Sequence, residues 1–145
     1  MNMNAKMHSL LQRAASESPP RSIKRAALTI EFVHDCFLLK DEYERNQHIS
    51  LSDFPDKTGF ECFINHLHLP YTGTSESLLS CLGYVVVLEA LLIREGKGNR
   101  FRIIVGVTDS DFTVRFHQVR NGESWTSENL EDYESEAMLL IDVPD

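Results

Sequence analysis

Two runs with a two-residue period, near the centre of the second half of the chain, constrain the fold most. From 101 to 106 apolar side chains occupy every odd position, and from 112 to 117 they occupy every even position. Successive side chains of a strand point to opposite faces, so each run predicts a strand with one buried face. Asp109, Ser110 and Asp111 between the runs are turn formers. The sequence therefore predicts an antiparallel β-hairpin.

A long apolar pattern with helical spacing precedes this hairpin. Thr74 or Ser75 is a good N-cap, and Gly96 supplies a C-terminal stop. The β-branched run 85–87 disfavours a helix, but the charged residues 89, 94 and 95 fall where a polar stripe would lie. We expect one long helix, whose apolar positions are Leu78, Leu79, Leu82, Val85, Val86, Leu92 and Ile93.

Shorter segments complete the predicted elements. Residues 26–32 alternate, which predicts a strand that begins near Ala27, and Cys36–Leu39 is either its hairpin return or its continuation across a bulge. Residues 41–47 and 50–59 resemble loops, whereas 61–66 favour a short helix or turn. Residues 137–143 predict a final strand that Pro144 ends.

These elements indicate an α+β fold, in which one long helix packs on an antiparallel β-sheet of about four strands. A chain of 145 residues fits one domain, which we place at residues 27–145. Residues 1–26 are expected to form a loose, flexible N-terminal arm. Only a short helical pattern interrupts that arm, at Met7, Leu10, Leu11 and Ala14.

The hydropathy pattern gives no sign of a membrane protein. The longest uninterrupted apolar run, 84–88, is stopped by Glu89 and is far shorter than the roughly 18 residues of a membrane span. The N-terminal region lacks the apolar core and cleavage site of a secretory signal. We expect a cytoplasmic protein with no membrane partner.

Charge is distributed unevenly along the chain, whose net charge is −8. Residues 1–27 have a net charge of +4, whereas residues 121–145 carry eight carboxylates and neither Lys nor Arg. An acidic field of that density repels nucleic acid and attracts basic proteins. We therefore expect a basic protein partner and no direct nucleic-acid partner.

Cysteine and serine chemistry gives little support to catalysis. Cys36, Cys62 and Cys81 are spaced too irregularly for a disulfide framework or a zinc pattern, and they are expected to be reduced and buried. Cys62 and His66 could touch across one helical turn, but that spacing is common by chance. Residues 96–98, Gly-Lys-Gly, are too short for a phosphate loop and follow a helix. No catalytic residue is predicted.

Histidine and arginine patterns also favour structural roles. His66 and His68 could share a zinc ion if they lay on one strand, but no HExxH motif or paired spacing supports a site, so neither metal nor cofactor is expected. A basic stripe could lie on one sheet face and touch RNA. Pairing with acidic residues across strands is the favoured reading of this stripe, which comprises Arg100, Arg102, Arg115, His117 and Arg120.

The candidate interaction segment is residues 122–134, which place the only Trp and a Tyr among carboxylates outside the regular strands. Aromatic anchors and carboxylates suit an interface with a Lys- and Arg-rich partner. The compatible alternative is that the Trp covers the core while the acids solvate the loop. The predicted partner-binding residues are Glu123, Trp125, Glu128, Glu131, Asp132, Tyr133 and Glu134.

Three stretches carry a resemblance to a known group of proteins. Residues 112–133, FTVRFHQVRNGESWTSENLEDY, the strand 136–142 and the run 65–68, Asn-His-Leu-His, resemble bacterial immunity proteins of polymorphic-toxin and contact-dependent growth inhibition systems. The resemblance covers about residues 60–143 and includes no catalytic motif. It implies a non-enzymatic antidote that neutralises, by stoichiometric binding in the cytoplasm, the C-terminal domain of a cognate toxin, often a basic nuclease.

Two other functions stay open at this point. An acidic secretion chaperone is also small and α+β, but it would dimerise and offer apolar grooves to an effector. A small hydrolase or metal enzyme is the less favoured possibility, and it would need His66 or Cys62 in a reactive role.

Overall fold

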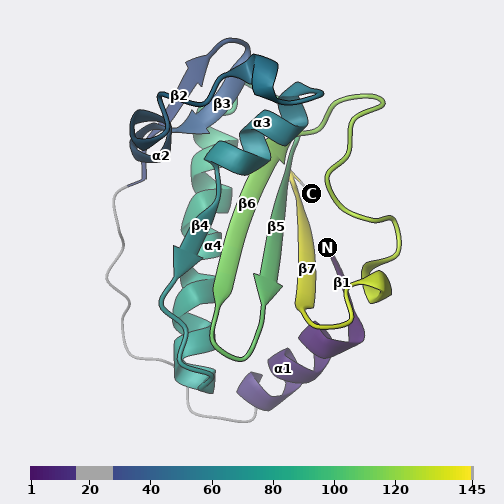
Figure 1. The fold of residues 1–145 in the computed structure, drawn as a ribbon. Helices are drawn as coiled ribbons and strands as arrows, with labels where there is room; N and C mark the ends of the chain where they lie inside the picture. Colours follow the sequence, from purple (N-terminus) through teal and green to yellow (C-terminus); the bar gives the residue numbers. More distant parts are fainter. Residues whose placement is uncertain (16–27, 145) are drawn as a thin grey trace.

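The computed structural model describes residues 1–15 and 28–144 (Figure 1). Its centre is an antiparallel sheet of five strands in the order β1-β7-β5-β6-β4. The sheet confirms the predicted α+β class. Its strands are β1 (Asn2–Met3), β7 (Ala137–Val143), β5 (Phe101–Val107), β6 (Phe112–Gln118) and β4 (Leu67–Leu69).

The predicted hairpin is strands β5 and β6, which pair from Phe101 opposite Gln118 to Val107 opposite Phe112. β7 pairs with the other edge of β5, so the predicted final strand lies inside the sheet and not at its margin. The alternating pattern gives the sheet two different faces. One face carries the principal apolar core, and the other carries the polar and small side chains Arg102, Gly106, Thr113 and Arg115.

Helix α4 (Ser75–Glu95) covers the apolar face and confirms the predicted long helix (Figure 1). It begins at Thr74, whose side chain accepts a hydrogen bond of 3.1 Å from the Ser77 amide. The buried side of α4 packs on the sheet through Leu78, Cys81, Val85, Leu88 and Leu92.

By length and mean hydropathy alone, α4 could also cross a membrane. In the described structure, one side of α4 packs against the apolar face of the sheet. Val86 and Ile93 lie on its outer side, where they are 63% and 58% exposed.

The other face of the sheet carries α3 (Lys57–Ile64), which lies across β6 at the end where that strand finishes (Figure 1). This helix begins earlier than the predicted helix at 61–66. Next to it, β2 (Ile30–Val33) and β3 (Cys36–Leu39) form a separate two-stranded hairpin. The expected start near Ala27 lies outside the described residues.

Two expectations for this region are corrected. The strand near 30 does not join the main sheet, because β3 turns back on it through His34 and Asp35, both with positive φ. The predicted loop at 41–47 contains the short helix α2 (Lys40–Arg45), and the loop at 50–59 contains the 3-10 turn η1 (Leu51–Asp53).

The expectation of a loose arm is wrong for residues 2–15. They form β1, which pairs with β7, and helix α1 (Ala5–Ala15), and both Met7 and Ala14 are buried in the same core as the sheet. Residues 16–26 of the predicted arm lie outside the described residues. The short helical pattern at 7–14 was therefore the signal of a packed helix.

Asn4 fixes this N-terminal segment to the rest of the molecule. Its side-chain oxygen accepts hydrogen bonds from the amides of Met7, at 3.1 Å, and Met138, at 2.8 Å. Its side-chain nitrogen donates to the Glu136 carbonyl at 2.8 Å. Asn4 is 2% exposed, so these groups have little access to water.

We expect Asn4→Ala to lower the free energy of unfolding by about 2–3 kcal/mol, because it leaves buried amides without an acceptor at the start of α1 and β7. Urea denaturation would measure the change. Asn2→Ala, at an exposed position of β1, is the matched control and should change stability by less than about 0.5 kcal/mol. Equal effects of the two variants would contradict the docked N-terminal segment.

Candidate functional site

The sheet face opposite α4 holds the candidate site, because α3 and the loop between β6 and β7 cover only part of it. We call residues 119–136 the acidic loop. Leu130 anchors this loop, since it is buried with Ile104, Met138 and Leu140 of the sheet, and Tyr133 packs against the same cluster. The acidic loop is therefore held on the sheet by an apolar contact of its own.

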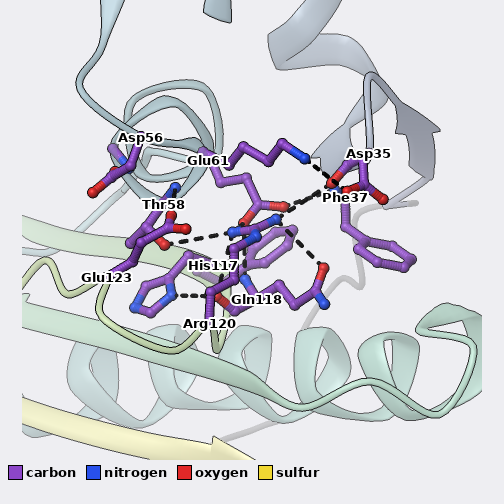
Figure 2. Close-up of polar contacts among 12 residues, drawn as sticks. Asp35, Phe37, Asp56, Thr58, Glu61, His117, Gln118, Arg120 and Glu123 are labelled. Carbon is purple, nitrogen blue, oxygen red and sulfur yellow. Dashed lines mark hydrogen bonds and ion pairs between the residues drawn. The ribbon is translucent and has the colours of Figure 1, made fainter.

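A buried carboxylate ties the elements of this side together (Figure 2). Glu61 of α3 has no exposed surface. One oxygen accepts hydrogen bonds from Arg120 Nη1, at 2.6 Å, and from the Gln118 amide, at 2.9 Å. The other accepts from the Phe37 amide at 2.8 Å. The charge is thus paired and hydrogen-bonded, as a buried carboxylate requires.

Asn65, immediately after α3, completes the same junction. Its side chain donates to the carbonyls of Phe37, at 2.8 Å, and Phe116, at 3.2 Å, and accepts from the Leu39 amide at 2.8 Å. Glu61 and Asn65 therefore satisfy main-chain groups of β3 and β6, which belong to different sheets. This follows from the need to pair every buried backbone group.

Two of the carboxylates that were predicted to contact a partner accept hydrogen bonds from backbone amides at the start of a helix. Glu123 Oε1 accepts from the amide of Thr58, in the first turn of α3, at 3.0 Å (Figure 2). Partial burial alone would raise the pKa of Glu123, but hydrogen bonds from Thr58 and the nearby charges of Arg120 and Lys57 hold it below its usual range. Glu131 Oε1 likewise accepts from the amide of Ala5, the first residue of α1, at 2.7 Å. Both positions suit a negative charge.

The other predicted residues of the acidic loop either bond within the loop or have exposed side chains. Tyr133 accepts a hydrogen bond from the Ser127 amide at 3.0 Å, and Asp132 accepts one from the Ser127 hydroxyl at 2.6 Å. Glu128 and Glu134 are exposed, and neither has an ion pair among residues 1–15 and 28–144. Some of the predicted partner-binding residues therefore hold the acidic loop in place, whereas Glu128 and Glu134 form no ion pair within the described structure.

Trp125 is partly exposed and packs against a charged side chain of the sheet. It is 42% exposed, and its ring lies 5.2 Å from the guanidinium carbon of Arg115. The ring therefore covers a polar part of the sheet and not the apolar core. Its outer surface remains available for contact.

Most side chains of the basic stripe are paired with carboxylates of the same molecule or are buried. Arg102 pairs with Asp142 across β5 and β7 at 2.7 Å, Arg120 pairs with Glu61, and His117 is 4% exposed. Pairing across strands, the reading favoured from the sequence, accounts for Arg102. Arg115 differs, because no carboxylate of the described residues lies within 4.0 Å of it.

The cysteine and histidine candidates do not form a reactive group in the described structure, since α3 ends at Ile64 and His66 lies beyond it. Burial raises the pKa of the Cys62 thiol to about 12, which keeps it protonated and unreactive. The rings of His66 and His68 lie 4.5 Å apart, and His68 Nδ1 lies 3.1 Å from Asp111. Within the described part of the chain, no group of three His, Cys, Asp or Glu residues could hold a metal ion.

A hollow of about 360 Å³ lies between the acidic loop and the sheet. One cross-strand row, comprising Met138, Gly106, Thr113 and His68, forms its floor. Sequence reasoning missed this hollow. The signal was available in the outward positions of β5 and β6, where Gly106 and Thr113 interrupt larger side chains, but their meaning depends on the register of the neighbouring strands.

The contribution of Glu61 to the free energy of unfolding can be measured with one substitution. Glu61→Gln removes the charge that Arg120 pairs with and places the side-chain NH2 group against at least one N–H donor, so we expect a loss of about 3–5 kcal/mol in the free energy of unfolding. Glu42→Gln, at an ion pair on the surface of α2, should cost less than about 1 kcal/mol. Chemical denaturation of both variants gives the comparison, and similar losses would refute a special role for Glu61.

His66 should make stability depend on pH. Burial, with the nearby charge of Arg115, lowers the pKa of His66 from 6.5 to about 4 in the folded protein. The unfolded chain then binds more protons, so stability is full above pH 6.5 and falls as the pH drops toward 4. Because His66 is partly exposed, we expect a loss on the order of 1 kcal/mol between pH 7 and 5.

Urea denaturation at pH 7 and pH 5 measures this difference. His66→Gln should reduce it, whereas His48→Gln, at an exposed loop position, should leave it unchanged. The assignment is wrong if the His66 variant retains the full pH dependence.

Comparison with known proteins places the chain in a family without adding a function. No curated protein and no solved structure matches it. One family model matches residues 2–145, which include every element described above. The chain therefore belongs to the family described as the Uncharacterized protein PM0498 family.

Proposed function

We propose that this protein acts by stoichiometric binding of a basic protein partner, as an immunity protein neutralises a toxin domain in the cytoplasm. The observation that carries the proposal is the exposed part of the acidic loop. There, Glu128 and Glu134 lack a cation among the described residues, and Trp125 is 42% exposed close by in sequence. Aromatic residues with partly exposed faces are typical anchors of protein interfaces.

The geometry narrows the predicted contact surface. Glu123 and Glu131 are engaged at helix starts, and Tyr133 packs against the sheet, so these three hold the loop in place. Trp125, Glu128, Asp132 and Glu134 remain as the contact residues that we propose. A loop fixed at several points loses little entropy on binding, which favours affinity.

Electrostatics supports a basic partner such as a nuclease domain. The net charge is −8, and the acidic loop and β7 contain no Lys between them. Opposite charges on the two proteins would accelerate their encounter, an advantage for an antidote that must meet each incoming toxin quickly. The resemblance of residues 60–143 to immunity proteins points the same way. A non-enzymatic role without a cofactor is part of the proposal.

The test uses the toxin domain encoded by a gene adjacent to the one for this chain. Surface plasmon resonance should give a stoichiometric complex, and co-expression should rescue cells from that domain. We expect Glu128→Lys with Glu134→Lys to slow association at least tenfold at low salt and to weaken its salt dependence.

The matched control reverses two exposed carboxylates of α2, Asp41→Lys with Glu44→Lys, and so carries the same net charge as the test variant. An equal slowing by both variants would mean that only net charge matters and would reject the proposed surface. Unchanged association of the test variant would reject it as well. A dimer that binds unfolded effectors instead of a folded toxin would replace the immunity function by that of a secretion chaperone.

A further inference from the structure

We propose that the hollow between the acidic loop and the sheet binds a small zwitterion of the α-amino acid type. Arg115 would receive its carboxylate and Glu136 its ammonium group, while Trp125 and Tyr133 would contact an apolar or aromatic side chain. All four residues line the hollow. This inference goes beyond partner binding and stands independently of it.

Arg115 is the first half of the site. Its guanidinium is partly buried, and its one hydrogen bond within the described structure runs from Nη1 to the Cys62 carbonyl at 3.1 Å. A guanidinium has five N–H donors in a planar fork that matches a carboxylate. Most of these donors have no protein acceptor here, although the group is partly removed from water. A carboxylate ligand would satisfy them.

Glu136 is the second half. Its side chain is partly buried and makes neither a hydrogen bond nor an ion pair with the described residues. A Cβ atom built on Gly106 would lie 2.6 Å from Glu136 Oε2 and 3.1 Å from Thr113 Oγ1. The carboxylate therefore lies over the floor of the hollow, in space that only a glycine leaves open.

The separation of these two charges indicates the kind of ligand. No Arg115 nitrogen lies within 4.0 Å of a Glu136 oxygen, yet both side chains line one hollow. Glu136 acts on Arg115 electrostatically, but neither group forms an ion pair with a described residue, and partly buried charges without a direct partner are costly. An ion of a single sign would satisfy one of them and be repelled by the other. A molecule with a carboxylate at one end and an ammonium at the other satisfies both.

The remaining lining of the hollow is suited to contact the side chain of the proposed amino acid ligand. Trp125 and Tyr133 supply aromatic surface, and Ile104 and Met138 supply aliphatic surface. A volume of about 360 Å³ accommodates an amino acid with a large apolar side chain.

The test is isothermal titration calorimetry of the full chain with three matched probes. L-phenylalanine has both charges, 3-phenylpropionate lacks the ammonium group and phenethylamine lacks the carboxylate. We expect L-phenylalanine to bind at least tenfold more tightly than either of the others, a difference of about 1.4 kcal/mol or more. L-leucine and L-methionine extend the test to aliphatic side chains.

Substitutions of lining residues test whether the amino acid binds in the hollow. Arg115→Met and Glu136→Gln should each weaken amino acid binding about tenfold or more, whereas Arg100→Met and Glu44→Gln, at exposed positions, should not. Gly106→Ala should also weaken it by displacing the Glu136 carboxylate.

Two results would overturn the inference. One is that none of the three amino acids binds at 10 millimolar, roughly the weakest affinity expected of a specific site. The other is that 3-phenylpropionate or phenethylamine binds as well as L-phenylalanine. Both comparisons use the unmodified protein, so they hold even if a variant fails to fold. Toxin binding is measured separately and could persist after either result.

Discussion

The fully buried carboxylate of Glu61 is the interaction on which this side of the molecule depends. A lone charge in that position would be costly, so its neighbours must supply a cation and amide donors. Those neighbours come from β3, from the end of β6 and from Arg120 at the start of the acidic loop. One side chain of α3 therefore sets the positions of the β2–β3 hairpin and of the loop that forms the candidate site.

The carboxylates of the C-terminal quarter have two different roles, which composition alone does not distinguish. Glu123 and Glu131 compensate the positive ends of α3 and α1, and Asp142 neutralises Arg102 across the sheet. Glu128 and Glu134 make no comparable interaction in the described structure. The charge available for the proposed partner is thus smaller than the sequence indicates.

The sequence predicts the elements whose burial is periodic. The β5–β6 hairpin, α4 and β7 follow from their apolar patterns, because each buries a regular face against the same core. β1 is too short to show a period, and the helical pattern of α1 does not reveal that Asn4 fastens this helix to β7. The hollow could not be predicted, since it depends on the register that sets Gly106 beside Thr113 and Met138.

The pairing of β1 with β7 joins residues that are far apart along the chain, with Asn2 opposite Leu140. β7 also lies between β1 and β5, so the sheet has a gap until residues 137–143 are present. The N-terminal segment therefore reaches its full set of contacts only after β7 has paired with β5. Because the pairing of β1 with β7 joins such distant parts of the sequence, we expect the closing of that gap to be a late and slow step of folding.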